Sequence, residues 1–149
     1  MQRMQKFVID SSVFIKLFLP EEEDSKKAFF LMDKIINEQI EVLAPRLFYY
    51  EVFGIARKNG IPSEEVWSIL QDYEGSLLHY VKEDWETTQK TLSICETGNK
   101  KSGFPTFYDA SYHALALLHN CDFITADRRH YEKTKKLGHV RLLSEMELS

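Results

Sequence analysis

The sequence predicts an α/β domain built on a mostly parallel sheet. Short apolar runs, each of the length of a buried strand, alternate along the chain with longer segments of helical periodicity, which is typical of βα units. The length of 149 residues suits one domain, so residues 1–149 are expected to form a single unit. No internal repeat or linker-like stretch divides the chain. A hydrophobic fraction of 44% and a charged fraction of 28% are ordinary for a globular protein.

The expected strands are short runs dominated by apolar residues, as buried strands of a parallel sheet are. In chain order they are Lys6–Asp10, Ile40–Ala44, Leu77–Val81, Cys121–Thr125 and Val140–Leu143. A segment of helical character separates each strand from the next, which allows the strands to run in the same direction.

The expected helices follow the apolar periodicity and have recognisable ends. Pro20 stops the first helix, Pro45 suits the first position of the third, an Asn-Gly pair closes the third, and Asp84 can cap the fifth. In chain order the helices span Ser11–Leu19, Glu21–Glu38, Arg46–Lys58, Pro62–Ser76, Asp84–Glu96, Thr106–Asn120 and Asp127–Leu137. Residues 97–105 form the only long loop-like stretch, between the expected helices Asp84–Glu96 and Thr106–Asn120.

Charge and targeting signals narrow the function classes. The chain has 19 Lys and Arg against 23 Asp and Glu, a formal net charge of −4, which disfavours nucleic-acid binding through overall positive charge alone. Asp10 and Lys16 interrupt the apolar stretch near the N-terminus, so no secretory signal is expected. No apolar run approaches the roughly 20 residues of a membrane-spanning helix. Cys95 and Cys121 fit no metal-binding or redox spacing, and a cytoplasmic protein that does not enter a membrane is expected.

Four acidic residues stand where apolar residues are expected. Glu51 is the only charge between the two arginines of R-L-F-Y-Y-E-V-F-G-I-A-R, and Asp109 is the only Asp, Glu, Lys or Arg in the expected helix Thr106–Asn120. Asp10 ends the first strand, and Asp127 follows the strand D-F-I-T with one residue between. A carboxylate in apolar surroundings is costly to bury unless it is paired, hydrogen-bonded or bound to a cation. Sites in open α/β sheets lie beyond the carboxyl ends of the strands, where these acids can converge.

Each acid taken alone also has a structural explanation. Asp10 and Asp127 can cap helices, Glu51 can lie on a narrow polar stripe, and Asp109 can belong to the first turn of its helix. The four together favour a site, because convergent carboxylates repel one another unless cations are present. An all-oxygen set suits Mg²⁺ or Mn²⁺ and not Zn²⁺, which prefers His and Cys ligands. Hard divalent ions held in this way support phosphodiester hydrolysis.

The segments around the four acids resemble those of a known family. They read F-V-I-D-S-S-V-F-I-K-L-F-L-P-E-E, Y-E-V-F-G-I-A-R, F-Y-D-A-S-Y-H-A-L-A and F-I-T-A-D-R-R-H-Y, in family order between residues 7 and 131. The sequence resembles the PIN-domain ribonucleases, in particular the VapC-like toxins of type II toxin–antitoxin systems. Each motif is weak alone, whereas the ordered set of four is specific.

The resemblance implies a three-layer α/β/α PIN-like fold and a Mg²⁺- or Mn²⁺-dependent endoribonuclease, the toxin of a toxin–antitoxin pair. It implies that the metal-binding and catalytic residues are Asp10, Glu51, Asp109 and Asp127, with Ser12 and Thr125 in support. It also implies RNA as substrate, a homodimer, and a cognate antitoxin. The antitoxin's C-terminal segment would lie in a groove formed by the early helices, Glu21–Glu38 and the pair within Arg46–Ser76.

Weaker signals accompany this pattern. Residues 128–141 carry six basic residues and one acidic residue, and Arg128, Arg129, Lys133 and Lys135 are candidates for RNA binding, although a solvated helix face explains them equally well. His113 shares a helical face with Asp109 and is expected to be a core histidine ahead of a metal ligand. The tyrosines near the acids can stack on unpaired bases but are expected to lie in the core instead; these are Tyr49, Tyr50, Tyr108 and Tyr112.

Other enzyme classes fit less well. A response-regulator receiver needs adjacent acids after its first strand, and a haloacid-dehalogenase-type phosphatase needs a second Asp two residues after the first. Ser11 and Ser12 occupy those positions after Asp10. Two alternatives within the family stay open, namely a stand-alone RNA-processing nuclease and a catalytically silent protein that binds RNA or a partner. The sequence leaves the RNA target and the number of metal ions undetermined.

Overall fold

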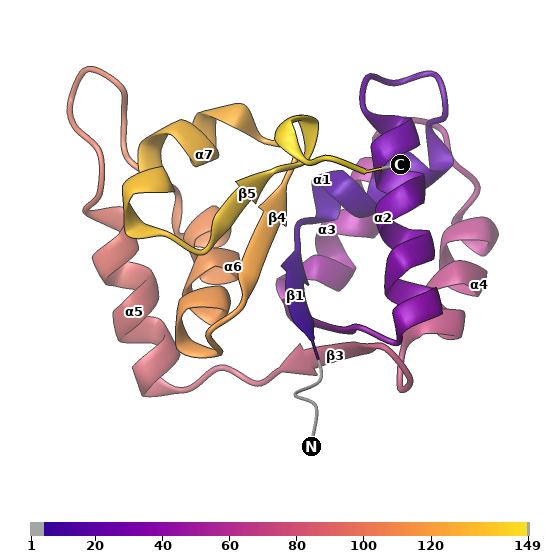
Figure 1. The fold of residues 1–149 in the computed structure, drawn as a ribbon, viewed down its shortest axis with the longest axis horizontal. Helices are drawn as coiled ribbons and strands as arrows, with labels where there is room; N and C mark the ends of the chain where they lie inside the picture. Colours follow the sequence, from indigo (N-terminus) through magenta and orange to yellow (C-terminus); the bar gives the residue numbers. More distant parts are fainter. Residues whose placement is uncertain (1–4, 149) are drawn as a thin grey trace.

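The computed structural model describes residues 5–148 and contains a five-stranded sheet. Its strands are β1 (Lys6–Ile9), β2 (Glu41–Pro45), β3 (Leu78–Val81), β4 (Asp122–Thr125) and β5 (Val140–Leu142). Their spatial order is β3-β2-β1-β4-β5, and each neighbouring pair is parallel. The prediction of a mostly parallel sheet is therefore confirmed (Figure 1).

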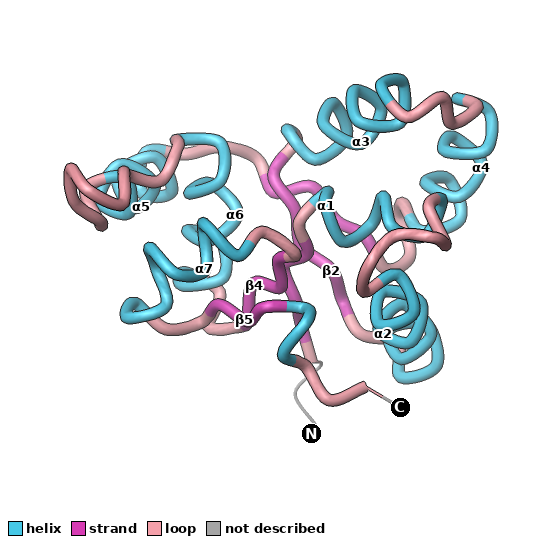
Figure 2. The backbone as a smooth tube through the Cα atoms, turned by 90° about the horizontal axis from the view of Figure 1, so that it is seen from above, coloured by secondary structure: helices cyan, strands magenta, loops and turns pink. Residues whose placement is uncertain are grey.

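Helices cover both faces of this sheet. They are α1 (Ser11–Phe14), α2 (Ser25–Glu38), α3 (Leu47–Lys58), α4 (Ser63–Tyr73), α5 (Trp85–Cys95), α6 (Phe107–Leu118) and α7 (Arg128–Thr134). Short 3₁₀ helices extend α1 over Ile15–Phe18 and α7 over Lys135–Leu137, and a third one covers Leu143–Glu145. Figure 2 shows α5, α6 and α7 on one side of the sheet and α1 to α4 on the other. This is the expected three-layer α/β/α arrangement.

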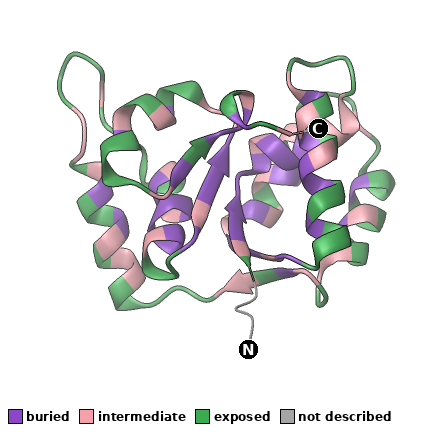
Figure 3. Cartoon of the chain, viewed as in Figure 1, coloured by how far each residue is buried: buried purple, intermediate pink, exposed green. Residues whose placement is uncertain are grey.

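The core follows from this layering. The central strands are covered on both faces, so their sequences are continuous apolar runs rather than alternating ones. Val8 in β1 and Phe123 and Ile124 in β4 are almost completely buried. Helix α6 packs directly on β1, β2 and β4 and buries most of its length, whereas the outer helices bury one stripe only (Figure 3). The two central strands and α6 therefore form the rigid support for whatever lies at their ends.

Two of the differences from the expected boundaries concern the starts of helices. The helix expected at Glu21–Glu38 begins at Ser25, because Asp24 adopts a left-handed conformation with φ 65° and Ser25 Oγ donates a 2.6 Å hydrogen bond to the carbonyl oxygen of Leu19. The acidic residues before it form a turn, and not the first turn of a helix. Pro45 is the last residue of β2 and does not open α3.

The parallel sheet gives the molecule two chemically different edges. Because all neighbouring strands are parallel, their carboxyl ends lie at one edge of the twisted sheet. In Figure 1, β1, β4 and β5 point upward, and α1 and α7 follow the ends of β1 and β4. The register of β1 on β4 pairs Ile9 with Ile124, and the backbone N–H of Asp10 donates a 3.0 Å bond to the carbonyl of Ile124. Asp10 and Thr125, the residues reached next along the two strands, are therefore neighbours. No helix in residues 5–148 is long and apolar enough to cross a membrane.

Candidate active site

Thr125, at the end of β4, joins two of the predicted acids. Its Oγ1 accepts a 3.0 Å hydrogen bond from the backbone N–H of Asp127 and donates a 2.8 Å bond to Oδ2 of Asp10. Because the hydroxyl accepts from the backbone, its own proton is directed toward Asp10. Thr125 is fully buried, so the link has little freedom to rearrange. Its place beside the acids is the one the sequence suggests for a supporting residue.

Ser12 connects the ends of β1 and β4, but its hydroxyl forms no hydrogen bond with a carboxylate. Its Oγ accepts a 3.3 Å hydrogen bond from the backbone N–H of Ala126, and its own backbone N–H lies 3.4 Å from Oδ1 of Asp10. Ser12 thus holds the start of α1 against the chain that leaves β4. Its predicted role in the chemistry stays a prediction.

Glu51 reaches the site from α3 on the opposite side. The hydroxyl of Tyr112, in α6, donates a hydrogen bond to Oε1 of Glu51. Ser11 Oγ lies 3.3 Å from the same oxygen and 3.2 Å from Oδ1 of Asp10, so it bridges the two acids. Sequence reasoning did not assign a functional role to Ser11 or Tyr112. The only signal for Tyr112 is its place three residues after Asp109, on the same side of α6.

Asp109 and Asp127 stand at helix starts. Asp109 is in the first turn of α6, where its backbone N–H donates a 3.1 Å bond to Oγ1 of Thr106. Asp127 caps α7, because its Oδ1 accepts bonds from the backbone N–H groups of Arg129 at 2.9 Å and His130 at 3.3 Å. Asp10 likewise caps α1. The structural roles considered for these acids are therefore real, and they do not exclude a second role.

The acids influence one another electrostatically. Burial raises the pKa of Asp10 to about 6, the hydrogen bond from Thr125 opposes this rise, and the charges of Glu51 and Asp109 add to it. Burial and the charge of Asp109 raise the pKa of Glu51. Burial and the charge of Asp127 raise the pKa of Asp109. Each acid thus lies within the field of another, and the structure brings all four to the carboxyl edge of the sheet.

The donor chemistry of this cluster fits a hard cation. Within residues 5–148, Oε2 of Glu51 and Oδ2 of Asp127 accept no hydrogen bond, and the mutual repulsion would be relieved by positive charge. In the same part of the chain, no three His, Cys, Asp or Glu side chains form a ready ligand set as placed. Mg²⁺ commonly uses one or two carboxylates and keeps several waters, so such a site does not require a closed shell of protein ligands.

The predicted basic residues divide into two groups. Arg128 pairs with Glu132 at 3.8 Å and with Glu145 at 3.6 Å, and Lys135 pairs with Glu132 at 2.8 Å. Arg129 is exposed and forms no ion pair within the described residues. Lys133 lies near enough to Asp109 to oppose the rise of that acid's pKa. Arg129 and Lys133 therefore carry the uncompensated positive charge beside the acids.

The expectations for the aromatic and histidine residues are confirmed in part. Tyr112 is fully buried, and His113 is a core histidine whose Nε2 lies 2.8 Å from the carbonyl oxygen of Gly138. The expectation of a core position is wrong for Tyr50 and Tyr108, which are 71% and 62% exposed. Each directly precedes an acid of the cluster in the sequence, and both point away from the packed face of their helix. Apolar neighbours in the sequence concealed this orientation.

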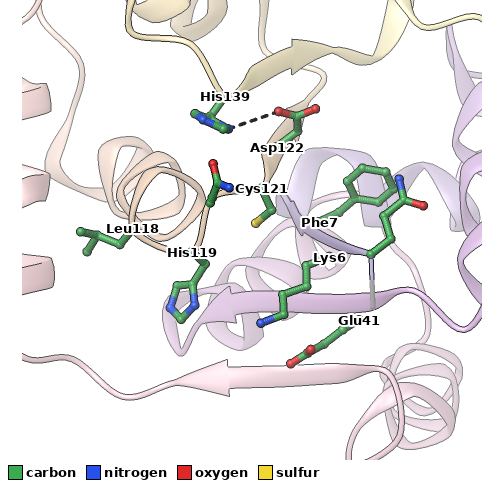
Figure 4. A pocket seen from close by; sticks show the side chains of 10 residues that line it. Lys6, Phe7, Glu41, Leu118, His119, Cys121, Asp122 and His139 are labelled. Carbon is green, nitrogen blue, oxygen red and sulfur yellow. Dashed lines mark ion pairs between the residues drawn. The ribbon is translucent and has the colours of Figure 1, made fainter. Parts of the chain in front are cut away.

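A pocket of about 800 Å³ lies elsewhere, at the amino edge of the sheet (Figure 4). Its lining includes Lys6, Glu41, Asp122 and His139, and none of the four acids of the cluster. His139 Nδ1 lies 3.5 Å from Oδ1 of Asp122, so a histidine and a carboxylate meet there. This pocket and the four acids therefore lie at opposite edges of the sheet.

Comparisons with known proteins agree on the type of domain. The PIN domain family model matches residues 7–136. A search of curated proteins returns no match to the chain.

Solved structures share its fold. A toxin-antitoxin complex from Klebsiella pneumoniae is 16% identical, with a TM-score of 0.61 over 93% of this chain and 98% of that chain. The structure of PAE2754 from Pyrobaculum aerophilum is 22% identical, with a TM-score of 0.60 over 95% and 93% of the two chains. VapC20 from Mycobacterium tuberculosis, a sarcin-ricin loop cleaving toxin, is 9% identical, with a TM-score of 0.62 over 85% and 93%.

Proposed function

The chain belongs to the PIN domain family, and from this premise we propose that it is a Mg²⁺- or Mn²⁺-dependent endoribonuclease of the VapC-like kind. The observation that carries the proposal is the gathering of Asp10, Glu51, Asp109 and Asp127 at one edge of the sheet, where burial and neighbouring acids raise the pKa of Asp10, Glu51 and Asp109. A fold that only needed stability would separate these charges or pair them with cations. Clustered acids with raised pKa values are typical of functional sites.

The four acids would hold the metal in this proposal. A bound Mg²⁺ or Mn²⁺ supplies an activated water and stabilises the leaving oxygen of a phosphodiester. Thr125 fixes the rotamer of Asp10 by its directed hydrogen bond, and the backbone of α7 fixes Asp127. These bonds limit the rearrangement of the two acids when a cation binds, which lowers the cost of assembling the site.

The surface around the acids suits a single strand of RNA. Lys133 and Arg129 would contact phosphates, which steers and orients the backbone beside the acids. Arg128 and Lys135, already paired with Glu132, would contribute less. The exposed rings of Tyr50 and Tyr108 are available to stack on unpaired bases.

A groove away from the acid cluster supports the proposal of an antitoxin partner. Helices α2 and α4 border a groove of about 730 Å³ whose lining includes Ile36, Ile69 and Tyr73. Trp67 on α4 and Ile36 on α2 are about half exposed. Such an apolar groove suits an apolar segment of a cognate antitoxin. One of the structurally similar chains is part of a toxin-antitoxin complex. The proposal also includes a homodimer and a cytoplasmic location. Both cysteines are free thiols, which is compatible with a reducing compartment.

The test is cleavage of single-stranded RNA by the purified protein. We expect cleavage with Mg²⁺ or Mn²⁺ and its loss when EDTA is added, with recovery on return of the ion. Asp109→Asn, prepared in the same way, serves as the control for contaminating ribonuclease. Cleavage that persists after thorough chelation would contradict the metal mechanism. Binding of RNA without cleavage under any metal condition would identify a catalytically silent PIN protein.

A further inference from the structure

Tyr112 is the most firmly held polar group beside the acids. Its ring is fully buried in α6 and stacks on Phe123 of β4, with ring centroids 5.6 Å apart and an angle of 10° between the planes. The hydroxyl donates to Oε1 of Glu51, which comes from α3 on the other side of the sheet. The ring therefore lies in the core while its oxygen reaches the edge of the acid cluster.

We propose that Tyr112 is a positioning residue for Glu51, whose carboxylate it holds facing Asp10 and Asp109 so that the other oxygen stays available to a cation. The proposal rests on the metal-dependent function proposed above. Glu51 has a long side chain on the partly exposed surface of a helix, and such a side chain loses conformational freedom when it is fixed. A buried and immobile donor fixes it before the metal arrives.

The donor is held in place by packing. The Tyr112 ring is fully buried and stacked on Phe123, so its hydroxyl stays beside Oε1 of Glu51. The phenol donates its one proton to this oxygen, and Oε2 of Glu51 accepts no hydrogen bond within residues 5–148. The second oxygen therefore remains available to a cation.

Ser11 cannot replace Tyr112 in this role. Its Oγ lies at hydrogen-bonding distance from both Asp10 and Glu51, at 3.2 and 3.3 Å, but a hydroxyl has one proton to donate. When that proton is directed to Asp10, the contact with Glu51 has no donor. The Tyr112 hydroxyl is the only other side-chain donor to Glu51 within the described residues, and it is therefore the one on which Glu51 depends.

The test compares two tyrosine-to-phenylalanine changes. Tyr112→Phe keeps the stacked ring and removes only the hydroxyl. Tyr80→Phe is the matched control, because the Tyr80 hydroxyl donates a 2.7 Å bond to Oε1 of Glu74, in a similar half-buried pair away from the acids. We expect Tyr112→Phe to weaken Mn²⁺ binding to the RNA-free protein by about tenfold or more, as loss of a residue behind a metal ligand does. Calorimetry with Mn²⁺ alone measures this affinity.

Further measurements separate positioning from packing. We expect Tyr112→Phe to lower kcat while the melting temperature of the metal-free protein changes about as much as in Tyr80→Phe. In a Glu51→Gln background, Tyr112→Phe should cause no further loss of Mn²⁺ affinity, because the two residues act through one contact. Should Tyr112→Phe not fold, Glu51→Asp tests the contact from the other partner, since its shorter carboxylate retreats from the hydroxyl.

The outcomes are distinct. Equal Mn²⁺ affinity in the wild type, Tyr112→Phe and Tyr80→Phe would overturn the positioning role and leave the proposed function intact. Full Mn²⁺ affinity in Glu51→Asp would overturn it as well. A wild-type protein that binds no Mn²⁺ would overturn both the proposed function and this inference.

Discussion

Charged side chains lie at both edges of the sheet. At one edge they have the same sign, and at the other they form pairs of opposite sign. At the carboxyl edge, burial raises the pKa of Asp10 and of Glu51, and the charge of Asp109 adds to both rises. At the amino edge, Asp122 pairs with the opposite charge of Arg141 at 4.0 Å. Asp122 also lies 3.5 Å from His139 (Figure 4). The amino edge also holds the pocket of about 800 Å³.

The contrast between clustered like charges and paired opposite charges indicates which edge is functional. Paired charges of opposite sign contribute little either way on a surface. Like charges held together reduce stability, and they persist where a ligand compensates the repulsion. The carboxyl edge is therefore the better candidate for function, although the pocket of about 800 Å³ lies at the amino edge. The following predictions set changes at one edge against changes at the other, from the largest expected effect to the smallest.

The largest contrast is in catalysis. We expect Asp109→Asn and Glu51→Gln to reduce RNA cleavage to background, a loss of about three orders of magnitude or more, of the size seen when a principal transition-state interaction is removed. Asp122→Asn, at the amino edge, should leave the rate unchanged. Single-turnover cleavage of one defined RNA measures all three variants. An Asp109→Asn protein that cleaves at the wild-type rate would remove Asp109 from the proposed ligands.

The acid cluster should also show in the pH dependence of stability. The pKa of Asp10 is raised by burial to about 6 in the folded protein, so folding favours its protonated form. This contribution is complete below the unfolded value and is lost as pH rises through 6, a total of roughly 3 kcal/mol for the shift. Without metal, we expect the free energy of unfolding of the wild type to fall relative to Asp10→Asn between pH 4 and pH 7.

Two buried histidines act in the opposite direction, which is why the comparison with Asp10→Asn is needed. Burial lowers the pKa of His113 and of His130 to about 4, so their contribution is lost as pH falls below the unfolded value. Both histidines remain in the variant, and their effect cancels in the difference. Chemical denaturation at several pH values, with and without Mg²⁺, measures it. A difference that does not change with pH would show that Asp10 titrates normally.

A smaller effect is expected for the exposed aromatic rings. Tyr108→Ala should weaken binding of single-stranded RNA to Asp109→Asn protein by about tenfold, in line with roughly 1–3 kcal/mol for one stacked base. Trp85→Ala removes an equally exposed ring from α5 and should have no effect. Fluorescence anisotropy with a labelled RNA provides the affinities. If both changes leave binding intact, Tyr108 does not take part in RNA recognition.

The smallest effect concerns the basic residues. Lys133→Gln and Arg129→Gln should each lower the slope of log affinity against log salt by roughly 0.7, the value for one phosphate contact on a single strand. Lys135→Gln should change the slope less, because Glu132 already pairs with Lys135 at 2.8 Å. Anisotropy titrations at several salt concentrations test this order. Equal slopes in all three variants would reduce the segment to an ordinary solvated helix face.

Much of the fold could be predicted from the sequence because its information is local. Apolar runs such as F-V-I and F-I-T specify buried strands, and the helices between them require parallel connections. The main boundary error, at Glu21–Glu38, arose because acidic residues suit the first turn of a helix and also suit a turn. The contacts of Ser25 with Leu19 decided between the two.

The candidate site, like the fold, could be predicted only in part from the sequence. The sequence by itself indicated the four acids as candidates, since each interrupts an apolar pattern and parallel strands bring their ends to one edge. Only the tertiary structure decided their partners. Glu51 and Tyr112 are 61 residues apart in the chain, and no periodicity encodes a contact between α3 and α6. Packing of distant segments likewise left Tyr50 and Tyr108 exposed and buried Tyr112, although all three have similar apolar neighbours. Local sequence sets which residues prefer burial, whereas the position of each side chain depends on surfaces that meet only after folding.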